Sequence, residues 1–130
     1  MVRSCCLAGI EGDKVAILSA ALRSAGAPLL SSVESLSVTR LGQLRPDLCI
    51  CDLDGAEGDP LETLRQIRFV LPGCLLGVYT ADSARSWVVA CHLAGANALI
   101  SKDSTEAQIA RGLRGVMASG CFTDPRFAAA

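Results

Sequence analysis

Short apolar runs alternate along this chain with stretches in which apolar residues recur at helical spacing. This alternation is typical of repeated βα units and not of a β-sandwich or a helical bundle. Strands are predicted at residues 4–8, 29–35, 48–51, 74–79 and 98–100, and helices at about 13–24, 37–44, 59–71, 83–93 and 105–119. Five such units predict an α/β fold, a flavodoxin-like (βα)5 doubly wound parallel sheet with strand order 2-1-3-4-5.

The predicted domain occupies residues 1–120 of the 130. The run at 29–35 is less apolar than the others, which suggests a strand at the edge of the sheet. Residues 121–130, CFTDPRFAAA, carry turn residues and no helical pattern of useful length. We expect them to be the start of a linker or a frayed terminus.

Composition limits the possible partners and surroundings of the chain. Its formal net charge is −1, with 12 basic and 13 acidic side chains, so the domain has no electrostatic footprint for nucleic acid or an anionic membrane. No apolar run approaches the length that spans a membrane.

Most of the seven cysteines lie inside apolar runs without CxxC spacing, which favours free, reduced thiols and a cytoplasmic location. Redox sensing by Cys5 and Cys6 is the alternative.

Three of the predicted strands lead into polar residues that suit one shared site. The run LCIC is followed by Asp52, LLGVYT ends at Thr80, and ALIS is followed by Lys102. Open α/β sheets bind their ligands in the crevice outside the carboxyl ends of the strands. We therefore expect an acid, a hydroxyl and an amine to share one crevice.

In this order and spacing, the motifs resemble the receiver domain of bacterial two-component response regulators, over nearly the whole chain. PDLCICD resembles the strand that ends in the phospho-accepting aspartate, here Asp52. GVYTA resembles the segment with the switch hydroxyl, here Thr80, and GANALISKDSTEAQI resembles the end of the domain in the NarL/FixJ branch, with Lys102 as the family's lysine. GVMASGCFTDPRF resembles the approach to that branch's linker, which leads to a LuxR-type helix-turn-helix.

The resemblance implies a signalling domain and not an enzyme. It implies a phosphoprotein within a regulator of transcription, whose partner is a sensor histidine kinase, another protein or a second copy of the chain in a homodimer. DNA would be contacted only through an output domain outside these 130 residues. Lys102 and Thr80 would contact the phosphoryl oxygens, since transfer to a carboxylate needs positive charge and hydrogen-bond donors around the phosphorus.

The sequence departs from the family at the metal site. Receivers bind Mg²⁺ through an acidic pair after the first strand together with the acceptor aspartate, but Gly9 and Ile10 stand at the matching positions. Glu11 is the remaining candidate to join Asp52 as a ligand; the alternative makes it a loop acid beside the first helix. Asp54 is expected to face solvent. Weak Mg²⁺ binding is therefore predicted.

A second departure concerns the partner surface. Leu99 stands where receivers carry an aromatic residue that rotates on activation, and Trp87 lies on the fourth predicted helix. Both are predicted to belong to a partner surface, whereas Tyr79 is expected to pack in the core. Two alternatives to a phosphorylated receiver stay open. One is a phosphorylation-independent pseudo-receiver that acts as an interaction or dimerisation module, and the other is a flavodoxin-like enzyme, although no cofactor-binding loop is visible.

Overall fold

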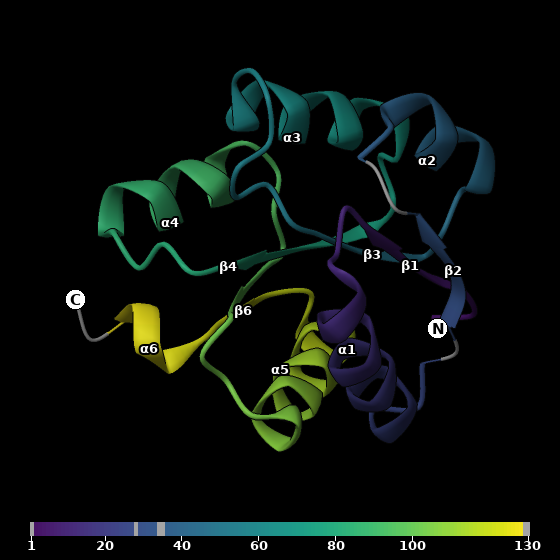
Figure 1. Ribbon diagram of the computed structural model, residues 1–130, viewed down its shortest axis with the longest axis vertical. Coiled ribbons are helices and arrows are strands. Elements are labelled where there is room, and N and C mark those ends of the chain that lie inside the picture. The colour runs from purple at the N-terminus through teal and green to yellow at the C-terminus, as the bar shows by residue number, and fades with distance from the viewer. Residues whose placement is uncertain (1, 28, 34–35, 129–130) are drawn as a thin grey trace.

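The computed structural model describes residues 2–27, 29–33 and 36–128 (Figure 1). The elements follow one another as β1 (Cys5–Ala8), α1 (Gly12–Ser24), β2 (Leu29–Val33), α2 (Val38–Leu44), β3 (Leu48–Cys51), α3 (Pro60–Val70), β4 (Leu75–Thr80), α4 (Arg85–Leu93), β5 (Ala98–Ser101), α5 (Glu106–Ser119), β6 (Phe122–Thr123) and α6 (Pro125–Ala128).

All strands pair in parallel, in the order β2-β1-β3-β4-β5-β6. The predicted α/β class and the predicted order of the first five strands are confirmed, including the edge position of β2. Residues 34–35, the end of the predicted second strand, lie outside the described residues. Because β1 and β3 are neighbours and their helices lie on opposite faces, the switch point of the topology falls at their carboxyl ends.

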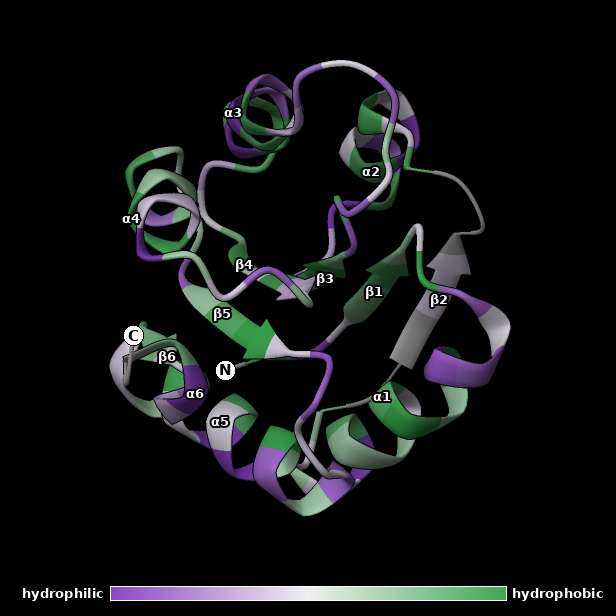
Figure 2. Cartoon of the chain, turned by 60° about the vertical axis from the view of Figure 1, so that its left-hand side comes forward, coloured by the Kyte–Doolittle hydropathy of each residue, from purple (hydrophilic) through white to green (hydrophobic). Residues whose placement is uncertain are grey.

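Two apolar cores cover the two faces of the sheet. Helices α1 and α5 pack on one face and α2, α3 and α4 on the other (Figure 2). Alternation along the strands divides the side chains between these layers, so Leu7, Ile50 and Tyr79 face α1 and α5 whereas Cys6, Cys49 and Val78 face the other three helices. The small cysteine and alanine side chains let the helices lie close to the strands.

Local signals in the sequence fix where the helices after β3 and β5 begin. Asp59 caps α3 by accepting a hydrogen bond from the Leu61 N–H at 3.0 Å, and Pro60 occupies its first position. Thr105 and Gln108 cap the start of α5 reciprocally. None of the helices in the described residues is long and apolar enough to cross a lipid bilayer.

Residues 121–130 were predicted to be the start of a linker or a frayed tail, but β6 and α6 form within the C-terminal segment, residues 121–128. Residues 129–130 lie outside the described residues. Phe122 and Thr123 pair with Ala98 and Leu99 of β5, and Phe127 is only 4% exposed in the core beside α4. The Phe122 ring lies over Gly112 of α5, where a Cβ atom would meet it at 2.7 Å from Cζ. A two-residue strand shows no periodicity, so the sequence pattern did not indicate it. The link from this segment to a further domain stays a prediction.

Candidate functional site

Asp52 lies directly after β3, at the switch point of the sheet. Its backbone N–H bonds to the Ala8 carbonyl at 3.1 Å, and its side chain is 9% exposed. Gly9, after β1, has a φ of 70° and passes so close that a Cβ atom there would lie 3.3 Å from the Asp52 carbonyl oxygen. Gly9 thus combines a left-handed backbone with a close approach, which a residue with a side chain tolerates poorly.

Lys102 reaches this carboxylate from the end of β5. Its Nζ lies 2.7 Å from Asp52 Oδ2 and 3.1 Å from Asp54 Oδ2, and 5.9 Å from the centroid of the Tyr79 ring. Burial alone would lower the pKa of Lys102, but its hydrogen bonds to the two carboxylates and their negative charges raise the pKa above its usual value. Lys102 is therefore a fixed positive charge between two acids.

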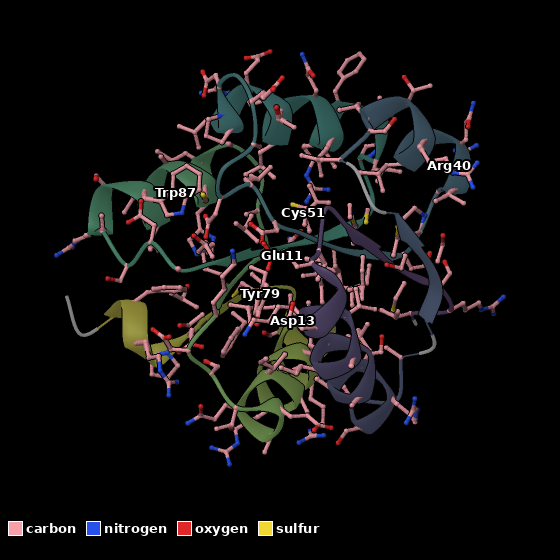
Figure 3. The ribbon with its side chains drawn as sticks, viewed as in Figure 1. Glu11, Asp13, Arg40, Cys51, Tyr79 and Trp87 are labelled. Carbon is pink, nitrogen blue, oxygen red and sulfur yellow. The ribbon has the colours of Figure 1, made fainter. Side chains whose placement is uncertain are left out.

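Thr80, the last residue of β4, is fully buried and its hydroxyl is shared among several partners. It donates to Asp54 Oδ1 at 2.7 Å, and it accepts from the Trp87 indole Nε1–H at 3.3 Å and from the Asp82 N–H at 3.1 Å. Figure 3 shows Trp87 on the α4 side of the sheet and Tyr79 on the other side. The single Thr80 proton is thus committed to Asp54.

Asp54 is an exposed residue, as expected, but its carboxylate is also bonded within the site, which was not expected. Besides the Thr80 hydroxyl and the Lys102 ammonium, it accepts the Ala81 N–H at Oδ2 over 2.8 Å, and its side chain is 26% exposed. Burial would raise the Asp54 pKa, but the bonds from Ala81, Thr80 and Lys102 outweigh it and hold the pKa below its usual value. The spacing in DLD did not indicate this position, because Asp54 lies in a turn after β3 and its partners come from the ends of β4 and β5.

The predicted metal ligands Glu11 and Asp52 follow β1 and β3, the two strands at the switch point. Glu11 is exposed and opens α1 through its backbone carbonyl, which accepts from Lys14 and Val15; Figure 3 labels it where β1 leads into that helix. Ile10 is buried in the core beneath α1. Within the described ranges, no three His, Cys, Asp or Glu side chains gather closely enough to hold a metal ion. An octahedral Mg²⁺ shell takes several hard oxygen ligands, and the loop after β1 supplies the apolar Gly9 and Ile10 where the resemblance would place an acidic pair.

The two residues predicted for the partner surface, Leu99 and Trp87, differ in their exposure. Leu99 is fully buried in the core under α4 and pairs with Thr123 of β6, so it offers no surface to a partner, which corrects that prediction. The added strand covers the edge of β5 that the predicted five-stranded sheet would leave open. Trp87 is half-buried and donates its indole N–H into the site. Its role in partner binding stays a prediction.

The fold is that of the receiver domains of response regulators. The chain is similar to the isolated receiver domain of RcsB from Salmonella enterica serovar Typhimurium with the phosphomimetic BeF3−, at a TM-score of 0.79 and 14% identity over 98% of this chain and 96% of the other. It is similar to a LuxR-family response regulator from Aurantimonas sp. SI85-9A1, at 0.80 and 17% over 99% and 94%. A response regulator from Thermotoga maritima matches at 0.77 and 17% over 92% and 100%.

At these identities the likeness shows the fold alone. No model of a known protein family matches the sequence, and neither does any curated protein. Function is therefore inferred from the residues at the carboxyl edge of the sheet.

Proposed function

We propose that the chain is a signalling receiver domain that accepts a phosphoryl group on Asp52. The observation that carries the proposal is the cluster at the switch point, where Lys102 Nζ lies 2.7 Å from the Asp52 carboxylate. Lys102 also contacts Asp54, which accepts a hydrogen bond from the Thr80 hydroxyl. The receiver fold supports the same reading. The proposed domain switches a partner and does not turn over a substrate.

The proposed chemistry uses the carboxylate as a nucleophile. An Asp52 oxygen bonds to the phosphorus of a phosphohistidine or a small phosphodonor, and the bond from phosphorus to the donor breaks with its electron pair on the leaving group. Lys102 offsets the charge that gathers on the phosphoryl oxygens, acting as a compact point charge. Impaired Mg²⁺ binding belongs to the proposal, since the loop after β1 offers Gly9 and Ile10 in place of acids.

Partners and location are proposed from the same reasoning. A sensor histidine kinase would supply the phosphoryl group in the cytoplasm. One of the similar structures is RcsB bound to the promoter rprA, of which this chain covers 67%. By analogy, we propose that this chain is the N-terminal part of a transcriptional regulator, which would contact DNA through an output domain and not through these residues.

The test is incubation of the whole chain with acetyl phosphate, with and without millimolar Mg²⁺, followed by intact mass and peptide mapping. Slow addition of one phosphoryl group is expected in the wild type and in the control Asp103→Asn, an exposed acid next to Lys102 in sequence. Asp52→Asn should abolish it. If folded protein takes up no phosphoryl group under any condition, including after substitution of Asp54, the proposal fails and the phosphorylation-independent pseudo-receiver replaces it.

A further inference from the structure

The hydrogen-bond donors around Asp52 are already occupied by a second carboxylate. Asp54 accepts the Thr80 hydroxyl at one oxygen, and the Ala81 N–H and the Lys102 ammonium at the other, over 2.7 to 3.1 Å. These donors come from the ends of β4 and β5, whereas Asp54 follows β3. A hydroxyl, a backbone amide and an ammonium that converge on one anion form an oxyanion-binding set.

Two of these donors have a single proton to give. The Thr80 hydroxyl and the Ala81 N–H can each form one strong hydrogen bond, and both point to Asp54. Lys102 has three protons, and Asp52 and Asp54 take two of them. A phosphoryl group on Asp52 could use Thr80 and Ala81 only after Asp54 had released them.

The backbone holds Asp54 close to this position. Its own N–H bonds to Asp52 Oδ1 at 2.9 Å, which closes a tight turn between the two acids. The Asp54 carboxylate therefore has little distance to travel before it meets Thr80 and Ala81, and its effective concentration at the donors is high.

We infer that the Asp54 carboxylate is a built-in competitor of the phosphoryl group for Thr80, Ala81 and Lys102. It fills the oxyanion-binding set, slows phosphorylation of Asp52 and holds Thr80 in an anion-bound position when no phosphoryl group is present. The inference about competition rests on the proposed function; the occupancy of the donors by Asp54 does not.

Labelling rates with acetyl phosphate test the competition. Asp54→Ala should raise the rate of Asp52 phosphorylation at least about tenfold, because two charge-assisted hydrogen bonds no longer have to be broken first. Asp54→Asn should raise it less, since the amide oxygen still accepts one bond. Glu62→Gln removes the same charge from an exposed position on α3 and should leave the rate near that of the wild type.

The chain carries its own optical reporter for the same experiment. Trp87 is its one tryptophan, and its indole donates to the hydroxyl that Asp54 binds. Addition of beryllofluoride should change Trp87 emission strongly in Asp54→Ala and weakly in the wild type, where Thr80 is already held by an anion. Equal responses in the two proteins would contradict the inference.

A measurement without any phosphoryl group separates the inference from the proposed function. In the Asp52→Asn background, adding Asp54→Ala should move the Ala81 amide and Trp87 indole proton resonances upfield, and adding Glu62→Gln should not. An Ala81 amide that keeps its position overturns the inference.

The outcomes distinguish the two proposals. Equal labelling of the wild type and both Asp54 variants overturns the competition and leaves Asp52 as the acceptor. Labelling in none of them overturns the acceptor role, and the Ala81 and Trp87 resonances then decide whether Asp54 occupies the donors.

Discussion

Two carboxylates on either side of the loop after β5 collect similar donors in different surroundings. Asp54 binds a hydroxyl, a backbone N–H and the ammonium of Lys102. Asp124, in the C-terminal segment, binds the Ser104 hydroxyl, the Ser101 N–H and the guanidinium of Arg126. Lys102 lies between Ser101 and Ser104, so the one loop is held from both sides.

The difference between the two acids is burial. The Asp124 side chain is 5% exposed and the Asp54 side chain 26% exposed. A buried carboxylate leaves its donors without any substitute when it is removed, whereas water or another anion can replace one that borders solvent. The same set of donors therefore forms a permanent structural contact at Asp124 and an exchangeable contact at Asp54.

The largest effect is expected from Asp124→Ala. It leaves the Ser104 hydroxyl and the Ser101 N–H without their acceptor in a buried site, at a cost of about 2–3 kcal/mol of unfolding free energy. Urea denaturation followed by circular dichroism measures it. Asp103→Asn, an exposed acid in the same loop, is the control and should change stability little. If Asp124→Ala lowers the unfolding free energy no more than Asp103→Asn does, Asp124 does not stabilise this loop.

A matched pair of glycines in α5 tests the C-terminal segment without touching Asp124. Gly112→Ala would push its new methyl group into the Phe122 ring and cost about 1–2 kcal/mol. Gly115→Ala has ordinary contact with Phe122 at 3.9 Å and should stabilise the helix by about 0.5–1 kcal/mol. Thermal unfolding of both variants gives the comparison, and shifts of the same sign would contradict the packing of Phe122.

Removal of Asp54 should cost little stability. Asp54→Ala is expected to lower the unfolding free energy by about 1 kcal/mol or less, since its ion pair with Lys102 borders solvent. The same urea titration as for Asp124→Ala measures it. A loss as large as that of Asp124→Ala would remove the distinction between an exchangeable and a permanent contact.

Acid pH should remove the small contribution of Asp54 to the unfolding free energy. The folded-state pKa of Asp54 lies below its usual value, so its contribution to stability is present above that usual value and is lost as pH falls through the folded pKa. The difference in unfolding free energy between wild type and Asp54→Asn should therefore shrink at acid pH. If this difference in unfolding free energy grows on acidification, the Asp54 pKa is not lowered in the folded state.

Much of the fold was predictable because local patterns and topology agree. Alternating apolar runs, the Asp59–Pro60 helix start and the Thr105 cap all point to the same βα units, and the doubly wound order follows from connection rules. Asp52, Thr80 and Lys102 reach one edge because parallel strands deliver their carboxyl ends there. These inferences need only short-range information.

The remainder depends on contacts between residues far apart in sequence. Asp54 turns inward because Thr80, Ala81 and Lys102 present donors to it, and nothing in DLD alone specifies those partners. The packing of the C-terminal segment depends on the room that Gly112 leaves for the Phe122 ring and on the loop after β5, which binds Asp124. Leu99 is buried for the same reason, since the segment closes the sheet beside it.

The seven cysteines lie in β1, β3 and α4 and directly before β4 and β6, so their reactivity can report where the structure opens. Cys121 is exposed, whereas the other six free thiols are buried, and burial raises the pKa of Cys5 to about 11 and of Cys51, Cys74 and Cys91 to about 12. An alkylating reagent should therefore modify one thiol at once and the others only when their element separates from the core. Identifying the modified cysteines over time by peptide mapping would report which layer opens first, since Cys5 belongs to one layer and the other five buried cysteines to the other.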